Sequence, residues 1–183
     1  MEQKSTFWKS AMTLGLYLAI ALILYNVVLY VLGENMNKTL GLITYVIMGA
    51  GIYWCQLNYR NNELGGYIEY SKALGFGVAV MLFAGVLNAL YTVILLKVDP
   101  SIMEQVRIMQ EEAMLQQGMS EEQIEMTGEM MSKFQSPIVI VISSLFTFAF
   151  IGFLISLVTS IFIKRKQEED AFEEAMDEIK AED

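Results

Sequence analysis

Sulfur-containing side chains gather in one stretch of this sequence, residues 97–135. It holds seven of the chain's thirteen methionines: Met103, Met109, Met114, Met119, Met126, Met130 and Met131. Thioether sulfur is a soft ligand that suits Cu(I), but methionine also packs irregular helix pairs and adaptable binding surfaces. The chain has no histidine, and the methionines are spread along the stretch. We therefore favour packing or partner binding over a copper site, and we predict no cofactor.

Carboxylates occupy the same stretch. There are eight of them, including the adjacent pairs Glu111-Glu112 and Glu121-Glu122. Calcium-binding loops space their oxygen ligands in a pattern of Asp, Asn and Gly, which this stretch does not have. A solvated acidic face is the preferred interpretation, and no metal ligands are predicted.

Few other residues in the sequence are suited to catalysis. Histidine, the commonest catalytic base, is absent, and Cys55 is the single cysteine. The segment 60–72 contains Glu63 and Tyr67, but its spacing is not typical of a catalytic triad, a phosphate loop or a metal motif. The sequence predicts a protein that is not an enzyme, with no catalytic residues.

Four long runs without charge must position these side chains. They are residues 10–33, 39–59, 73–96 and 136–163, the last of which is 28 residues long. About 20 residues rising 1.5 Å each match a hydrocarbon core about 30 Å thick, so each run can cross a bilayer as a helix. Hydrophobic residues make up 55% of the chain, and its mean hydropathy is +0.43. We predict an all-α integral membrane four-helix bundle over residues 1–166, followed by an acidic tail at 167–183.

The basic residues favour one orientation of these spans. With the amino terminus inside, eight Lys and Arg residues lie on the cytoplasmic side and four lie outside. Cytoplasmic flanks of membrane spans are enriched in Lys and Arg. Both termini are therefore predicted to be cytoplasmic, with residues 97–135 on the outer face.

Residues 97–135 contain the start and stop signals of two helices. Asp99 is a suitable N-cap with Pro100 at the first helical position, and Gly118 supplies the stop. Ser120 and Gln123 have the spacing of a capping box, in which each side chain bonds the backbone N–H of the other residue. The sequence thus predicts an extramembrane helical hairpin between the third and fourth spans.

Two amides lie deep in the apolar runs. Asn26 is 16 residues beyond the start of the first run, and Asn88 is 15 residues beyond the start of the third. Both runs travel outward, so at 1.5 Å per residue the two heights agree within about 2 Å. An unsatisfied amide in hydrocarbon costs several kcal/mol. We predict that both side chains face the bundle interior, bonded to each other or to hydroxyls of the fourth span.

Small residues recur at four-residue intervals within the spans, as in Ala11, Gly15 and Ala19. They let helix backbones approach closely in lipid, where packing and hydrogen bonds hold a bundle together. Such stripes serve packing within one chain or between copies of it. The sequence is therefore compatible with a monomer and with a homo-oligomer.

The amount and the position of charge limit which partners and which functions are expected. A net charge of −9 argues against nucleic acid. The predicted partner is the lipid bilayer. The outer hairpin and the acidic tail are the two candidate sites for a protein partner. The four runs carry no Asp, Glu, Lys, Arg or His, which disfavours ion-coupled transport. We predict an interaction or structural component of the cell envelope; the alternative is a small transporter or channel formed by oligomerisation.

Two segments carry a family resemblance. Residues 60–77, RNNELGGYIEYSKALGFG, and residues 119–125, MSEEQIE, resemble the Domain of Unknown Function 4199 family of small four-span bacterial membrane proteins. The resemblance covers about residues 5–166 and leaves out the acidic tail. It implies the same four-span layout and an inner-membrane location, and it supplies no activity and no catalytic residues.

The orientation is tested by cysteine labelling in intact spheroplasts. A cysteine introduced at Gln116 is expected to react with a membrane-impermeant thiol reagent, because it lies in the predicted outer hairpin. A cysteine at Gln167, in the predicted cytoplasmic tail, is expected to stay unlabelled until the membrane is opened. The reverse pattern would invert the topology.

Overall fold

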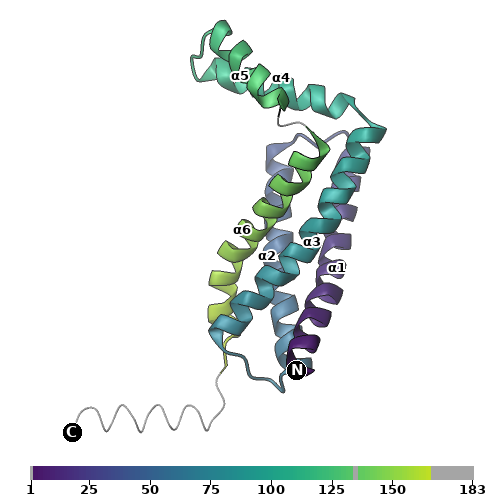
Figure 1. The fold of residues 1–183 in the computed structure, drawn as a ribbon, viewed down its shortest axis with the longest axis vertical. Coiled ribbons are helices and arrows are strands. Elements are labelled where there is room, and N and C mark those ends of the chain that lie inside the picture. The colour runs from purple at the N-terminus through teal and green to yellow at the C-terminus, as the bar shows by residue number, and fades with distance from the viewer. Residues whose placement is uncertain (1, 134–135, 166–183) are drawn as a thin grey trace, which may run out of the picture. The chain divides into compact units, whose positions relative to one another are not determined.

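The computed structural model describes residues 2–133 and 136–165, and these residues form helices joined by short connections (Figure 1). In chain order the helices are α1 Glu2–Val31, α2 Lys38–Glu63, α3 Tyr70–Val98, α4 Ser101–Gln116, α5 Glu121–Lys133 and α6 Pro137–Ile163. The predicted all-α fold class is confirmed. The predicted tail, 167–183, lies outside the described residues.

Four of these helices are long and apolar enough to cross a membrane. The spans are Thr6–Val31, Lys38–Glu63, Tyr70–Val98 and Ile138–Ile163. Each of the four predicted runs corresponds to one of these helices; α2 and α3 extend beyond their charge-free runs at both ends, α1 extends beyond its run at the amino end, and α6 lies within its run. The first ends two residues early because Gly33 turns the chain with φ +72° and Glu34 N–H bonds the Leu29 carbonyl at 2.8 Å.

The chain divides into two compact units. Among the described residues, the first unit comprises 2–84 and 148–165, and the second comprises 85–133 and 136–147. Helices α3 and α6 each contribute one part to each unit. Four helical segments therefore pack in the first unit, whereas the second contains the α4–α5 pair.

Close backbone approach explains the small residues of the first unit. A Cβ atom added at Gly15 of α1 would lie 2.8 Å from the Val80 carbonyl oxygen of α3. A Cβ added at Gly152 of α6 would lie 2.6 Å from Met81 Cβ, also on α3. Neither position has room for a larger residue. Part of the small-residue pattern therefore serves packing within one chain, as in other membrane helix bundles.

Aromatic rings pack one end of the first unit. Tyr59 of α2 stacks on Phe76 of α3 with ring centroids 4.0 Å apart and planes 6° apart. Phe7 of α1 meets both rings edge-on, at 5.9 Å and 5.5 Å. Such pairs contribute about 0.5–1.5 kcal/mol beyond the area that they bury. They fix α1, α2 and α3 together at this end.

The carboxyl end of α6 is held at the same end by hydrogen bonds. Arg60 Nη1 donates to the Ile163 carbonyl at 3.1 Å, and Tyr70 Oη donates to the Leu157 carbonyl at 3.1 Å. Ile68 and Arg165 exchange two backbone hydrogen bonds of 3.0 Å. The last carbonyls of a helix lack partners within it, and they attract positive charge. The 60–70 segment supplies hydrogen-bond donors to α6 and, in Arg60, a positive charge at its carboxyl end.

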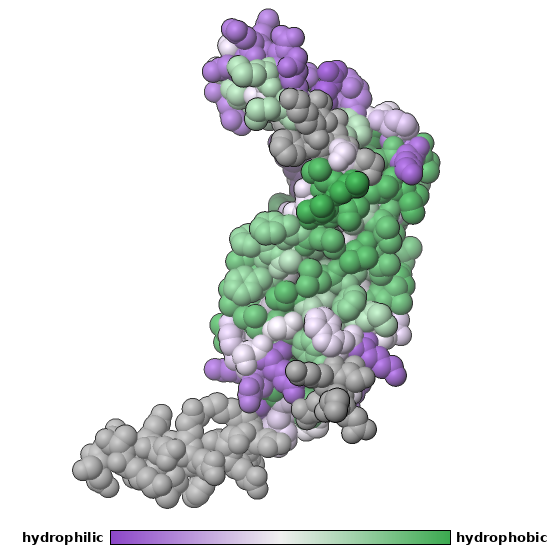
Figure 2. All heavy atoms as spheres, in the orientation of Figure 1, coloured by the Kyte–Doolittle hydropathy of each residue, from purple (hydrophilic) through white to green (hydrophobic). Residues whose placement is uncertain are grey.

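Large apolar side chains cover the outside of these helices. In Figure 2, apolar residues spread over α3 and α6, whereas polar residues gather on α4 and α5. On α6 the exposed side chains include Ile142, Phe146 and Phe150. Exposed apolar patches of this extent mark a surface that meets lipid or another protein. With the four long apolar helices, this surface indicates a multi-pass membrane protein.

Two glycines of α3, two residues apart and therefore on opposite faces of the helix, make a matched test. A Cβ at Gly77 would overlap Ser156 Oγ, whereas a Cβ at Gly75 on the same helix meets nothing within 4 Å. Gly77→Ala is expected to destabilise the protein by about 1–3 kcal/mol through overpacking. Gly75→Ala is expected to leave stability unchanged or raise it by up to about 1 kcal/mol, because alanine favours helix. Reversible unfolding in micelles measures both, and equal effects would contradict the close approach at Gly77.

Candidate functional site in the helical hairpin

The hairpin starts with a polar turn. Asp99 Oδ1 accepts hydrogen bonds from Ser101 N–H at 3.1 Å and from Ser101 Oγ at 2.6 Å. Helix α4 begins at Ser101, so Pro100 occupies the cap position that the sequence prediction gave to Asp99. Pro100 nevertheless has helical dihedrals, φ −64° and ψ −19°, so the chain already turns into the helix at this residue. The Asp99 carboxylate still accepts from the first turn.

The turn between α4 and α5 follows its sequence signals. Gly118 has φ +80°, and the N–H of Met119 bonds the Met114 carbonyl at 3.2 Å. Ser120 N–H then donates to Gln123 Oε1 at 3.0 Å, and Gln123 N–H donates to Ser120 Oγ at 3.4 Å. These are the two reciprocal bonds of a capping box. Because the signals are local, the hairpin geometry is encoded within the segment itself.

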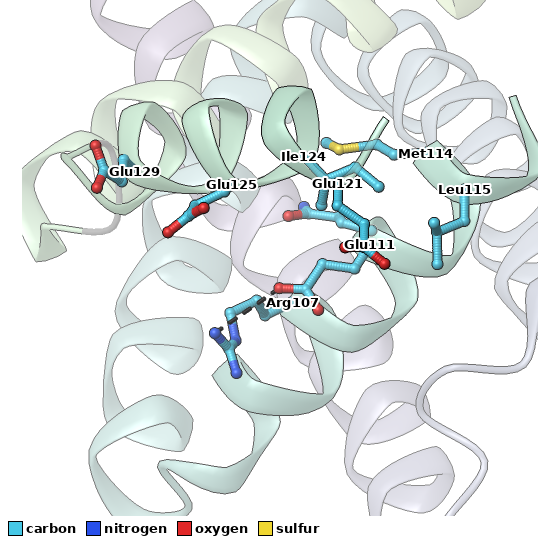
Figure 3. A pocket seen from close by; sticks show the side chains of 10 residues that line it. Arg107, Glu111, Met114, Leu115, Glu121, Ile124, Glu125 and Glu129 are labelled. Atoms are coloured by element: carbon cyan, nitrogen blue, oxygen red, sulfur yellow. Dashed lines mark ion pairs between the residues drawn. The ribbon is translucent and has the colours of Figure 1, made fainter. Parts of the chain in front are cut away.

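A groove of about 560 Å³ lies between α4 and α5 (Figure 3). Met114, Leu115 and Ile124 supply its apolar side chains. Its other lining residues are Arg107, Gln110, Glu111, Glu121, Glu125, Gly128 and Glu129. Four glutamates against one arginine give the lining a net charge of −3. The groove is thus both apolar and strongly acidic.

Arg107 is engaged by acids of its own helix. It forms a bidentate ion pair with Glu104, with Nη2–Oε1 at 2.6 Å and Nε–Oε2 at 3.1 Å, and it reaches Glu111 at 3.7 Å. The hydrogen bond and charge of Glu104, and then the charge of Glu111, raise the pKa of Arg107 above its ordinary value. Arg107 therefore stays charged. Its ion pairs in the described structure are with Glu104 and Glu111 of α4, and none is with Glu121 or Glu125 of α5.

Helix α5 presents its acids in register. Glu121, Glu125 and Glu129 follow one another at four-residue spacing, which places them on one helix face. Gly128 lies beside them, and a Cβ added there would meet nothing within 4 Å. A glycine inside a helix costs about 1 kcal/mol relative to alanine. Its lack of a side chain leaves room for another chain to approach this face.

The methionines do not share one place in the structure. Met114 lines the groove, whereas Met126 and Met130 are exposed. Over residues 2–133 and 136–165, no group of three or more His, Cys, Asp or Glu side chains is placed to hold a metal ion. The lining of the groove combines carboxylates with apolar side chains, and such a lining suits a cationic, partly apolar ligand.

The two predicted amides lie in different units. Asn26 is half-buried, and its Nδ2 donates to the Leu22 carbonyl of its own helix at 2.8 Å. Asn88 is buried, and its backbone carbonyl accepts from Thr92 Oγ1 at 2.9 Å. The proposed contact between Asn26 and Asn88 stays a prediction.

Sequence reasoning missed a third amide, Gln56. Its side chain is completely buried, and Nε2 donates to the Ala73 carbonyl of α3 at 3.0 Å and to Ser160 Oγ of α6 at 3.1 Å. Gln56 lies only three residues from the end of the predicted span 39–59, so no contact in the bundle interior was predicted for it. Its spacing from Ile52 was the available signal, because both positions lie on one buried face of α2.

Fold and surface together define a class: a multi-pass α-helical membrane protein with an acidic helical hairpin. The chain belongs to the family described as Protein of unknown function (DUF4199), whose profile matches residues 13–165. The predicted resemblance is thereby confirmed. No curated protein and no solved structure matches the chain.

The capping box predicts a local effect of mutation. Ser120→Ala removes the acceptor for Gln123 N–H and is expected to cost about 1 kcal/mol of helix stability. Faster proteolysis at residues 116–125 is the expected readout. Ser120→Asp restores an N-cap acceptor and should return cleavage to the wild-type rate. Unchanged cleavage in Ser120→Ala would show that the cap does not hold this turn.

Proposed function

We propose that this chain is a non-enzymatic protein of the bacterial inner membrane whose outer hairpin binds a basic amphipathic segment of another envelope protein. The acidic and apolar groove between α4 and α5 is the observation that carries this proposal. Its helices give a partner helix a preformed surface, and preformed surfaces lower the entropic cost of binding.

The charge pattern of the groove supports a basic partner. Lys or Arg residues at four-residue spacing on a partner helix would face Glu121, Glu125 and Glu129, which share that spacing. Apolar residues between them would contact Leu115 and Ile124. Met114 adds a flexible thioether that adapts to the shape of the bound side chains.

The proposed orientation rests on the basic residues at one end of the first unit. Arg60 bonds the end of α6, and Ile68 pairs with Arg165. The 60–70 connection and the carboxyl end of α6 are therefore neighbours, and both carry Lys or Arg. Positive residues are retained in the cytoplasm, so this end is assigned to the inside and both termini with it.

Transport by an oligomer is the alternative, and the interior of the first unit argues against a transport path through the protomer itself. The buried positions of its described residues are mostly Leu, Ile, Ala, Val and aromatic side chains. A transport path needs continuous polar lining. The buried polar side chains in this unit are Gln56, Ser156 and Ser160, which form one local cluster. A packed and mostly apolar core of this kind suits a structural or interaction protein.

Photocrosslinking in native membranes tests the proposal. A photoreactive amino acid at Leu115, which lines the groove and is exposed, is expected to capture one defined protein. The same probe at Ile108, which is exposed on α4 but does not line the groove, should capture it weakly or not at all.

Paired charge variants decide whether the groove is responsible. Glu121→Gln with Glu125→Gln should reduce the Leu115 crosslink about tenfold, because two charged contacts are lost. Glu112→Gln with Glu122→Gln removes the same charge from exposed hairpin positions outside the groove and should have little effect. Equal loss in both pairs, or a captured protein without a basic segment, would refute the proposed groove.

A further inference from the structure

A second groove, of about 480 Å³, lies between α1 and α2 in the first unit. Its lining combines one cation, one anion, neutral hydrogen-bonding groups and two large rings. The residues that matter here are Lys9, Thr13, Tyr17, Trp54, Asn58 and Glu63. This groove is unrelated to the hairpin and takes no part in the function proposed above.

The charge-free runs predict that the groove lies at the depth of the lipid headgroups. Lys9 immediately precedes the charge-free run 10–33, and Glu63 ends α2 four residues after the run 39–59. The charged groups therefore sit where two neighbouring spans leave the hydrocarbon. Tyr17 and Trp54 lie eight and nine residues further in, about 12–14 Å along the helices. Both rings are about half exposed, at 55% and 49%, and so are available to a molecule from the bilayer.

The two charges match a zwitterionic headgroup. The Lys9 ammonium attracts a phosphate, and the Glu63 carboxylate attracts a primary ammonium group and accepts its hydrogen bonds. Asn58 and Thr13 can donate to phosphate or ester oxygens. Below them, Tyr17 and Trp54 offer the amphipathic rings that commonly lie against glycerol and the upper acyl chains.

We propose that this groove binds a phospholipid with an ethanolamine headgroup. A choline headgroup has the same charges but no N–H donor, so it cannot hydrogen-bond Glu63. A glycerol headgroup lacks the cation altogether and leaves its phosphate's negative charge near Glu63. Glu63 is therefore the residue that selects among lipids, and Lys9 is the residue that binds the phosphate they share.

Native mass spectrometry of the full chain in micelles tests this proposal. Phosphatidylethanolamine, phosphatidylcholine and phosphatidylglycerol with identical acyl chains are added separately at equal concentration. Wild-type protein is expected to retain phosphatidylethanolamine about fivefold better than the other two lipids, the effect of one charged hydrogen bond at a partly exposed site. Equal retention of all three would overturn the proposal.

Single variants separate the two roles. Glu63→Ala removes both the charge and the hydrogen-bond acceptor, and it should abolish the preference for ethanolamine over choline while keeping general lipid retention. Lys9→Ala should lower retention of all three lipids. The matched controls are Glu69→Ala and Lys72→Ala, which remove the same charges from the 60–72 segment outside the groove. Glu63 and Lys9 are exposed, so these variants should fold normally. Persistence of the ethanolamine preference in Glu63→Ala would refute the assignment, as would its loss in Glu69→Ala.

Discussion

The packing of the first unit depends on one buried side chain, Gln56, which joins three helices. Its amide nitrogen links α2 to the Ala73 carbonyl of α3 and to Ser160 of α6. An amide without partners in apolar surroundings costs several kcal/mol, so these helices are held where both bonds can form. Gly77 permits the approach, because any larger residue there would overlap Ser156 and the Gln56 amide. Gln56 Oε1 and Ser156 Oγ have no hydrogen-bond partner among the described residues, so the two bonds of the amide nitrogen carry the polar contact at this junction.

The hairpin obeys a different constraint. Its turn is fixed by Gly118 and by the reciprocal bonds of Ser120 and Gln123, all within a few residues of one another. Nothing in that geometry requires a lipid environment. The apolar helices can therefore anchor the chain while the α4–α5 groove keeps its charge pattern in water. This separation of an apolar anchor from a charged groove is what the proposed binding role requires, and transport of a solute does not require it.

Local signals were readable from the sequence, and contacts between spans were not. The four apolar helices and the hairpin follow from charge-free runs, caps and a glycine stop, each of which acts within a few residues. Gln56 escaped notice because its partners lie 17 and 104 residues away in the chain. Asn26 shows the converse, because a partner on another helix was predicted for it. Its amide instead donates to the Leu22 carbonyl, one turn earlier in its own helix. The groove between α1 and α2 combines residues from two spans and so has no signature in either one.

A double-mutant cycle tests the central role of the Gln56 junction most directly. Gln56→Leu, Ser160→Ala and the double variant would be compared by reversible unfolding in micelles. The cycle compares the losses in the free energy of unfolding. If the side-chain hydrogen bond joins α2 to α6, the sum of the two single losses should exceed the loss in the double variant by about 0.6–1.7 kcal/mol, the range known for polar contacts between membrane helices. Effects that add to within about 0.3 kcal/mol would contradict the bond between Gln56 and Ser160, and with it the claim that this side chain joins α2 to α6.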